Sequence, residues 1–339
     1  MIISRTPLRI SFCGGGTDFE DYYKINGGAV ISTTINKYVY VTIAKKFDGK
    51  IHLRYSEIEC VDNINQLRHN LIREALRLIG IVEGVEIVII SDAPMTGCGL
   101  GSSSSLSVSS LMAFSAYRGF NICGESLTKQ ACDLEIKILG SPIGKQDQYA
   151  VSFGGFNLLI FESNEEVIVN SLSTAKKEKV KWLQDSSMLF YLGKGHSSSE
   201  ALAEHKNNIK SKMNILDCQI ELVNHFYNWL HGDEPNHVAG EIINLNWKYK
   251  IEMSPKATNN DINEIIAKIL QSGAYGAKVC GAGSSGFLLI ICEEEKQKFV
   301  RKSLNFLTEL DFSFEDEGTK IIYHDIDKEK KRKESENTS

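Results

Sequence analysis

The sequence predicts an α+β fold, and two observations lead to this prediction. Segments rich in β-branched and aromatic residues, which are typical of strands, come in a block, and a block with apolar residues at helical spacing follows it. This order lacks the regular strand–helix alternation of a doubly wound parallel sheet. The composition is that of an ordinary globular protein, with 42% hydrophobic and 24% charged residues in 339, which is enough for one large or two ordinary domains.

The first half of the chain contains most of the expected strands. Strands are predicted over residues 3–12, 28–35, 37–47 and 84–91, and a hairpin over 153–163 and 165–172. Helices are predicted over residues 64–80, about 103–117 and 126–140. We expect Gly80 to end the first of these helices and Ser126 to cap the last.

The second half of the chain begins after a lysine-rich stretch, with a boundary near Lys179. Residues 197–270 are expected to be mostly helical, and strands are expected over 273–281 and 285–294. The sequence therefore divides into an N-terminal domain over 1–178 and a C-terminal domain over 179–326. The tail 327–339 is charged and has no apolar anchor, so we expect it to be disordered.

The composition also limits the function. A net charge of −5 gives no electrostatic reason for binding nucleic acid or an anionic membrane, and no apolar run is long enough to span a bilayer. The first residues lack the apolar core and the cleavage site of a signal peptide. Eight cysteines without a C-x-x-C pair favour reduced thiols over zinc sites or disulfides. We expect a cytoplasmic protein with no nucleic-acid or membrane partner, and a homodimer is left open.

The segment MTGCGLGSSSSLSVSS, residues 95–110, directly follows the predicted strand 84–91. A glycine loop between a buried strand and a helix leaves backbone N–H groups unpaired at the helix start, where they bind anions such as phosphate. A serine-rich flexible loop with a capped helix is the alternative that these residues alone leave open. A Walker loop is excluded because G-x-x-x-x-G-K-[ST] does not occur.

A second glycine pattern, G-x-G-x-x-G, occurs at Gly281, Gly283 and Gly286. A dinucleotide-binding fingerprint needs a helix straight after these glycines, whereas this chain continues with the strand-like FLLIICEE. The context therefore excludes hydride transfer. It favours a tight β-turn or a second backbone loop near a ligand.

Three stretches carry a family resemblance: PLRISFCGGGTD (7–18), PMTGCGLGSSSS (94–105) and KVCGAGSSGF (278–287). In order and spacing they resemble the signature stretches of the GHMP small-molecule kinases, which include galactokinase and mevalonate kinase. The resemblance implies a two-lobed GHMP kinase fold with the active site in the cleft between the lobes. It also implies ATP as the phosphoryl donor and Mg²⁺ as the metal.

The resemblance further implies roles for single residues. The residues matching the loop that holds the ATP triphosphate are Gly97, Gly99, Leu100, Gly101, Ser102, Ser103, Ser104 and Ser105. Ser103 and Glu135 match the magnesium ligands, Asp147 matches the catalytic aspartate, and Arg9 matches the cation near the transferring phosphoryl group. Taken singly, Glu135 could be a solvated helix residue, Asp147 a turn or cap residue, and Arg9 with Asp18 a surface ion pair.

The opening stretch is similar to the branch of sugar kinases that phosphorylates the anomeric carbon. The implied acceptor-binding residues are Gly14, Gly15, Gly16, Thr17, Asp18, Gly281, Gly283 and Ser284. Where galactokinase has Gly-Glu-His-Thr-Asp, this chain has Gly-Gly-Gly-Thr-Asp, which counts against galactose and leaves room for a bulkier sugar.

The expected acceptor is therefore D-glycero-D-manno-heptose 7-phosphate, phosphorylated on its anomeric hydroxyl. Lys194 and His196, in LGKGHSSSEAL, are candidates to hold its distal phosphate, and Lys145 is another donor. A capped helix start with incidental charge is the alternative for LGKGHSSSEAL. A kinase for a neutral sugar such as fucose, and a non-catalytic nucleotide- or sugar-binding relative, remain alternative functions.

Overall fold

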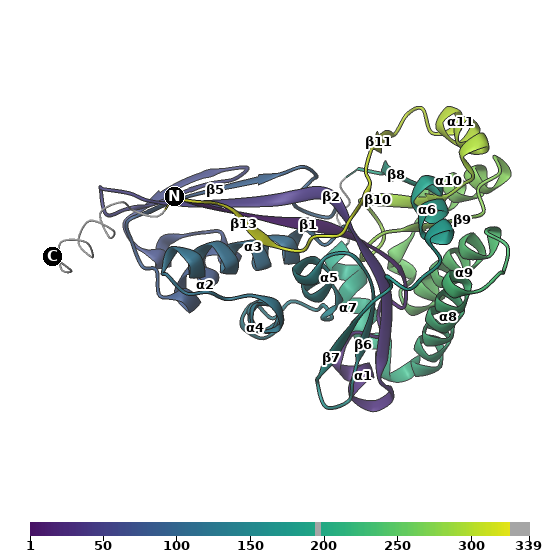
Figure 1. The fold of residues 1–339 in the computed structure, drawn as a ribbon, viewed down its shortest axis with the longest axis horizontal. Coiled ribbons are helices and arrows are strands. Elements are labelled where there is room, and N and C mark those ends of the chain that lie inside the picture. Colours follow the sequence, from purple (N-terminus) through teal and green to yellow (C-terminus); the bar gives the residue numbers. More distant parts are fainter. Residues whose placement is uncertain (194–197, 326–339) are drawn as a thin grey trace.

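The computed structural model describes residues 1–193 and 198–325, and within these ranges the strands form two sheets (Figure 1). The strands of the larger sheet are β1 (Ile2–Cys13), β2 (Gly28–Lys45), β3 (Ile51–Arg54), β4 (Ile58–Val61), β5 (Val85–Ser91), β6 (Phe156–Phe161), β7 (Val167–Ser171), β12 (Phe314–Glu315) and β13 (Lys320–His324). Those of the smaller sheet are β8 (Ser187–Tyr191), β9 (Gly276–Val279), β10 (Phe287–Ile291) and β11 (Thr308–Leu310).

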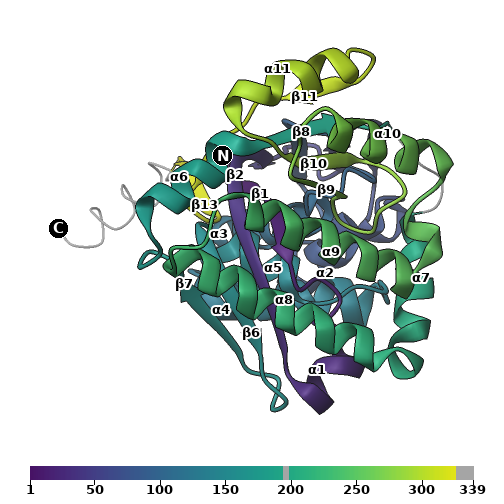
Figure 2. The same cartoon turned by 90° about the vertical axis from the view of Figure 1, so that its right-hand side faces the viewer.

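The helices cover both sheets. They are α1 (Glu20–Asn26), α2 (Asn70–Ile79), α3 (Ser102–Tyr117), α4 (Gly124–Cys132), α5 (Gln146–Phe153), α6 (Lys177–Ser186), α7 (Ser198–Asn208), α8 (Met213–His231), α9 (His237–Met253), α10 (Asn260–Gln271) and α11 (Glu294–Ser303). In Figure 1, α2 and α3 lie under the large sheet at the left, and α8 and α9 lie at the right. Figure 2 shows α8 and α9 side by side. The α+β prediction is confirmed.

The long strand β2 corrects the prediction of two separate strands over 28–35 and 37–47. The register against β1 shifts between Pro7 and Leu8, which pair with Tyr38 and Ile35. Two residues of β2 are therefore left over as a bulge, and a bulge bends a strand without ending it. In the sequence, the polar Asn36 and Lys37 suggest a break between two strands. In the fold they form the bulge, on one side of which β2 pairs with β5 and on the other side with β6.

The helix predicted over 126–140 differs at both ends. Helix α4 starts at Gly124, with Cys123 in the cap position, so Ser126 lies inside the first turn and is not the cap. The continuation Asp133–Ile138 is a π-helix, which is rare and often occurs at functional sites. Helix α2 does end at Gly80, whose φ of 76° is left-handed, as predicted.

The chain crosses between the two sheets more than once. The hairpin predicted over 153–172 is present as β6 and β7, and Gly281–Gly286 joins two antiparallel strands, β9 and β10. The strands β12 and β13 return to the large sheet and pair with β2 and β1. Residues 314–324 thus lie on the first sheet, and the division at residue 178 stays a prediction. The predicted disordered tail falls at 327–339, outside the described residues.

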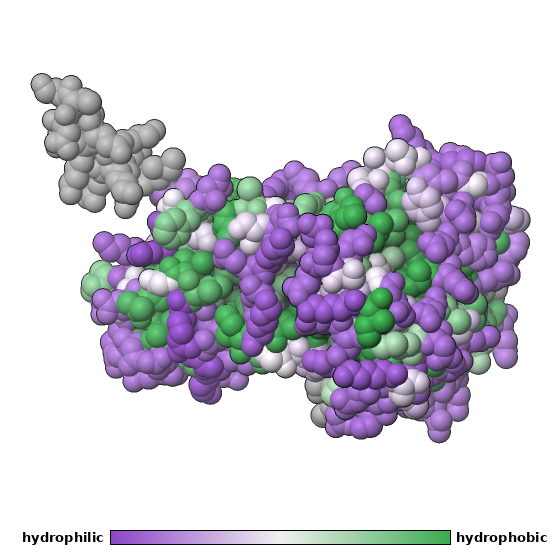
Figure 3. Space-filling view, turned by 90° about the horizontal axis from the view of Figure 1, so that it is seen from below, coloured by the Kyte–Doolittle hydropathy of each residue, from purple (hydrophilic) through white to green (hydrophobic). Residues whose placement is uncertain are grey.

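The apolar side chains form a large core between the first sheet and its helices and a second core around β9 and β10. On the face seen from below, apolar residues gather towards the middle, and the right-hand end is mostly hydrophilic (Figure 3). Among the described residues, no helix is long and apolar enough to cross a membrane.

Two glycine loops from distant parts of the chain touch through their backbones. A Cβ atom on Gly99 would lie 2.5 Å from the carbonyl oxygen of Cys280, and one on Gly281 would lie 2.5 Å from the Cα of Gly99. The N–H of Phe287 donates a hydrogen bond of 3.0 Å to the carbonyl of Cys98. The loop after β5 and the turn between β9 and β10 therefore hold each other in place, and both need glycine for it.

We expect Gly99→Ala to lower the free energy of unfolding by about 2–4 kcal/mol, because it adds an overlap to a left-handed φ of 78°. Gly119→Ala is the matched control, since its φ is 83° but no atom lies within 4 Å of its added Cβ. The control should cost only about 1–2 kcal/mol. Urea unfolding measures both, and an equal loss would contradict the importance of the loop contact.

Candidate active site

A cavity of about 510 Å³ lies between the elements of the large sheet and the wall formed by α7, α9 and β9. The predicted residues that line it are Arg9, Gly15, Gly16, Asp18, Gly97, Gly99, Gly101, Ser102, Ser103, Ser104, Glu135, Asp147, Gly281 and Gly283. The predicted residues outside its lining are Gly14, Thr17, Leu100, Ser105 and Ser284. Lys194 and His196 lie outside the described residues. All three glycine stretches thus contribute to one cavity.

The loop before α3 is held by its own serines. The Ser102 hydroxyl donates to the Met95 carbonyl at 2.8 Å, and the Ser105 hydroxyl donates to the carbonyls of Pro7 at 2.8 Å and Gly101 at 3.1 Å. Ser103 stays exposed at the start of this 16-residue helix, where backbone N–H groups are free to bind an anion. Ser102 and Ser105 therefore hold the loop in place, and Ser103 is left accessible.

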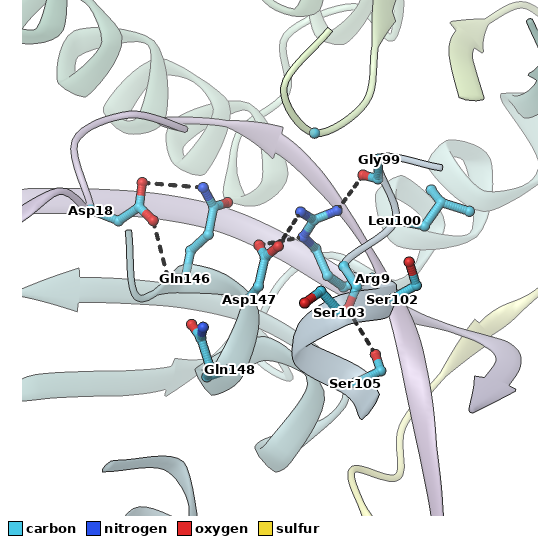
Figure 4. A network of polar contacts seen from close by, with 12 residues as sticks. Arg9, Asp18, Gly99, Leu100, Ser102, Ser103, Ser105, Gln146, Asp147 and Gln148 are labelled. Carbon is cyan, nitrogen blue, oxygen red and sulfur yellow. Dashed lines mark hydrogen bonds and ion pairs between the residues drawn. The ribbon is translucent and has the colours of Figure 1, made fainter. Parts of the chain in front are cut away.

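Arg9 joins this loop to Asp147 (Figure 4). Its Nε and one terminal nitrogen donate to the two oxygens of Asp147 at 2.7 and 2.6 Å, and its other terminal nitrogen donates to the Gly99 carbonyl at 2.6 Å. Burial lowers the pKa of Arg9, but the charge and hydrogen bonds of Asp147 outweigh burial and raise it. The interpretation of Arg9 and Asp18 as a surface ion pair is wrong, because both are buried and Arg9 pairs with Asp147.

Glu135 lies in the π-helical turn and is buried, with 1% of its surface exposed. Its carboxylate accepts hydrogen bonds of 2.7 Å from the Ser103 hydroxyl and from the Gln148 amide. Burial raises the pKa of Glu135, although the hydrogen bonds from Ser103 oppose the shift. The interpretation of Glu135 as a solvated helix residue is therefore wrong.

Asp18 lines the cavity together with Gln146. Its carboxylate accepts from the N–H of Gly16 at 3.0 Å and from the backbone and side chain of Gln146, each at 3.1 Å (Figure 4). A side chain at Gly144 would overlap this carboxylate. Burial raises the pKa of Asp18, and the nearby Asp147 adds to the shift.

Some polar atoms in the lining of the cavity are buried without a hydrogen-bond partner among the described residues. Within the described residues, the lining atoms that are buried and unpaired include Ser11 Oγ, Gln146 Oε1, His205 Nε2 and Ser285 Oγ. Burial lowers the pKa of His205 to about 3, so its ring is neutral. Buried polar groups are normally paired, so these atoms are free to bond to water or to a ligand in the cavity.

Several lining residues were missed by the sequence analysis: His205, Gln219, Asn246, Lys250 and Lys278. The lysine in the otherwise apolar AYGAKVC, just before a glycine turn, was the one signal that could have been used. The others lie on amphipathic helices, where nothing in the pattern distinguishes a cavity residue from a solvated one. Lys145 lies outside this cavity, with its Nζ 4.6 Å from the centre of the Tyr23 ring.

Comparison with known families supports the resemblance noted in the sequence. The profile of the GHMP kinases N terminal domain matches residues 68–155, and that of the GHMP kinases C terminal matches residues 237–307. The chain is 28% identical to a D-glycero-alpha-D-manno-heptose 7-phosphate kinase of Campylobacter jejuni, over 94% of this chain and 98% of that protein. It is 23% identical to an L-fucokinase/L-fucose-1-P guanylyltransferase of Bacteroides fragilis, over 87% of this chain and 35% of that protein.

Solved structures show the same fold. A D-glycero-D-manno-heptose 1-phosphate kinase from Bacteroides thetaiotaomicron superposes with a TM-score of 0.72 and 27% identity, over 96% of this chain and 100% of that one. Phosphomevalonate kinase of Streptococcus pneumoniae, in complex with phosphomevalonate and AMPPNP, superposes with a TM-score of 0.74 over 93% of this chain and 100% of that one. Its 16% identity supports the fold alone.

The stability of the protein should depend on pH through Lys250. Burial and the charge of Lys278 lower its pKa from 10.5 to about 7; Arg9 also lowers it, while Cys280 and Asp147 raise it. Between these two values the unfolded chain binds a proton that the folded amine has released. Rising pH therefore stabilises the fold through this group, by up to about 1.4 kcal/mol per pH unit.

Lys250→Met removes this contribution. We expect the free energy of unfolding of the variant to exceed that of the wild type most near pH 6, and this difference to shrink as the pH rises towards 10. Urea unfolding at several pH values measures the difference. Lys248→Met, on an exposed position of the same helix, is the control and should follow the wild type. A difference between Lys250→Met and wild type that does not change with pH would contradict the buried charge.

Proposed function

This chain belongs to the GHMP kinase family, and from that premise we propose that it is an ATP-dependent sugar kinase. Its acceptor is D-glycero-D-manno-heptose 7-phosphate, which it converts to the 1,7-bisphosphate. The observation that carries this proposal is the single cavity in which the glycine loop before α3, the Arg9–Asp147 pair and the Asp18–Gln146 pair meet. Similarity to the Campylobacter heptose 7-phosphate kinase over nearly the whole chain supports the acceptor.

The proposed reaction moves one phosphoryl group. The oxygen of the anomeric hydroxyl forms a bond to the γ-phosphorus of ATP, and the bond from that phosphorus to the β–γ bridging oxygen breaks. ADP leaves with the electron pair of that bond, and Asp147 accepts the proton of the hydroxyl. Arg9 holds both oxygens of Asp147, so the carboxylate has one orientation towards the acceptor.

The side chains fit a magnesium ion. Mg²⁺ prefers a few hard oxygen ligands and keeps several waters. Ser103 occupies an exposed position, and its hydroxyl donates to a Glu135 oxygen 2.7 Å away, so the two side chains would hold the ion. When bound, the ion would neutralise charge on the β- and γ-phosphates.

The acceptor hydroxyls would bind at the Asp18 end. Asp18 and the neutral His205 face the glycines of GGGTD, and a Cβ atom on Gly16 would lie 2.5 Å from the Nε2 of His205. The missing side chain makes room for the His205 ring beside the backbone of Gly16. We keep Lys194 and His196 as candidates for the distal phosphate.

The wider setting belongs to the same proposal. The bisphosphate would be a step towards nucleotide-activated heptose for surface polysaccharide, made in the cytoplasm. The division into domains over 1–178 and 179–326 remains our proposal as well. A neutral sugar such as fucose stays as the second candidate acceptor, because a fucokinase is also among the relatives.

Asp147→Asn should lower kcat by about 100-fold or more while it leaves ATP binding near normal, because a positioned base is lost. Steady-state kinetics and ATP titration measure the two effects. The exposed, ion-paired Asp133→Asn serves as the control and should behave like the wild type. Full turnover by Asp147→Asn, with the true acceptor, would contradict the assignment of Asp147.

The acceptor is tested with heptose 7-phosphate, free heptose and fucose at equal concentration. We expect heptose 7-phosphate to give the highest kcat/KM. Replacing Lys194 or His196 should raise its KM about tenfold or more without changing the KM for ATP, since a charge-assisted contact contributes about 1.5–3 kcal/mol. Equal or better turnover of a neutral sugar would exclude the proposed acceptor and leave the kinase activity standing.

A further inference from the structure

Lys250 projects into the cavity from α9 without a charged partner. Asn246 and Lys250 are four residues apart on one face of α9, Ser254 directly follows the helix, and all three line the cavity. The Lys250 ammonium donates to the carbonyl of Gly281. This is its one hydrogen bond to the residues that the structure describes, and it forms no ion pair with them. Two of its three N–H donors are therefore available to a ligand.

The other cations of the cavity are already engaged. Arg9 donates through all three of its nitrogens, twice to Asp147 and once to Gly99, so its charge is matched by that carboxylate. The Lys278 ammonium donates to the carbonyls of Ser11 at 3.1 Å and Phe12 at 3.0 Å and to Asn246 Oδ1 at 2.8 Å. Its three N–H groups are thus all used. Among the described residues that line the cavity, Lys250 is the cation that has unused N–H donors.

The position of Lys250 points to the reaction centre. Its hydrogen-bond partner Gly281 touches Gly99 in the loop before α3. The charges of Arg9 and Asp147 also affect the pKa of the Lys250 amine, and these two residues are the pair that we propose to contact the acceptor hydroxyl. Three carboxylates line the cavity, but Asp147 pairs with Arg9, and the hydrogen-bond partners of Asp18 and Glu135 among the described residues are amide and hydroxyl donors. None of the three pairs with Lys250, so an anion that binds beside the amine would match its charge.

We propose that Lys250 is a catalytic residue whose ammonium donates a hydrogen bond to an oxygen of the phosphoryl group in transfer. This inference rests on the proposed kinase function. Phosphoryl transfer demands positive charge around the equatorial oxygens, and Arg9 cannot supply its full charge while it pairs with Asp147. The negative charge of the bound phosphates favours the protonated form of Lys250, so the ammonium keeps its protons throughout the step. The proton of the acceptor still goes to Asp147, and ADP still leaves with the electron pair.

The experiment compares wild type, Lys250→Met, Lys250→Arg and the exposed control Lys248→Met. One readout is kcat at saturating ATP with heptose 7-phosphate, free heptose and fucose. We expect Lys250→Met to lose about 100-fold in kcat with every acceptor that the wild type uses. Lys250→Arg should recover most of the loss because it keeps the charge, and Lys248→Met should equal the wild type.

The second readout needs no acceptor. ADP with magnesium is titrated in the presence and absence of aluminium fluoride, which takes the place of the transferring phosphoryl group. Wild type and Lys248→Met should bind ADP more tightly with aluminium fluoride. Lys250→Met should bind ADP alone with the affinity of the wild type. The increase in ADP affinity that aluminium fluoride causes should be at least tenfold smaller in this variant. Thermal unfolding of each variant checks that it is folded.

Three results would overturn the inference or locate its failure. Unchanged kcat and an unchanged aluminium fluoride gain in Lys250→Met would exclude a role at the phosphoryl group. If Lys250→Met only raised the KM for phosphorylated acceptors, the inference would be overturned, and Lys250 would instead be assigned to the phosphate that the acceptor already carries. A wild type that gains from aluminium fluoride but does not use heptose 7-phosphate would contradict the proposed acceptor, and the variants would still decide about Lys250.

Discussion

The backbone contact between Gly99 and the turn at Cys280–Gly281 is the constraint on which the rest of the site depends. Any side chain at Gly99 or Gly281 would strike the opposite backbone, so the two loops can lie this close only because both are glycine. The contact joins the loop before α3 to the hairpin β9–β10 of the second sheet. It brings the wall that carries Lys250 and Lys278 against the loop whose Gly99 carbonyl binds Arg9.

The cavity also contains several charged side chains, and they differ in how their charge is compensated. Arg9 and Asp147 form an ion pair, and the Lys278 ammonium donates its hydrogen bonds to two backbone carbonyls and to Asn246. The carboxylates of Asp18 and Glu135 are held by amide and hydroxyl donors and not by cations. Such groups raise the free energy of the protein without ligands, which is the usual cost of a site prepared for charge that arrives with the substrate.

Much of the fold could be predicted because its signals are local. Strand composition, the helical spacing around Leu71–Leu76 and the stop at Gly80 depend on residues near one another in the sequence. The predictions failed where distant pairing decides the outcome. Residues 36 and 37 form a bulge because β1 continues alongside β2, and β12 and β13 return to the first sheet because their partners are β1 and β2. No local pattern encodes such partners.

The sequence by itself determined the three glycine stretches and, through their resemblance to one family, the candidate residues Arg9, Glu135 and Asp147. Only the tertiary structure decided that Arg9 pairs with Asp147 and not with Asp18, and that Glu135 is buried beside Ser103. It also decided that Lys250 faces the cavity. The physical reason is that a glycine loop is defined by residues that follow one another in the sequence. The ion-pair partner of a side chain such as Arg9 lies more than 100 residues away and is brought close only by the packing of the fold.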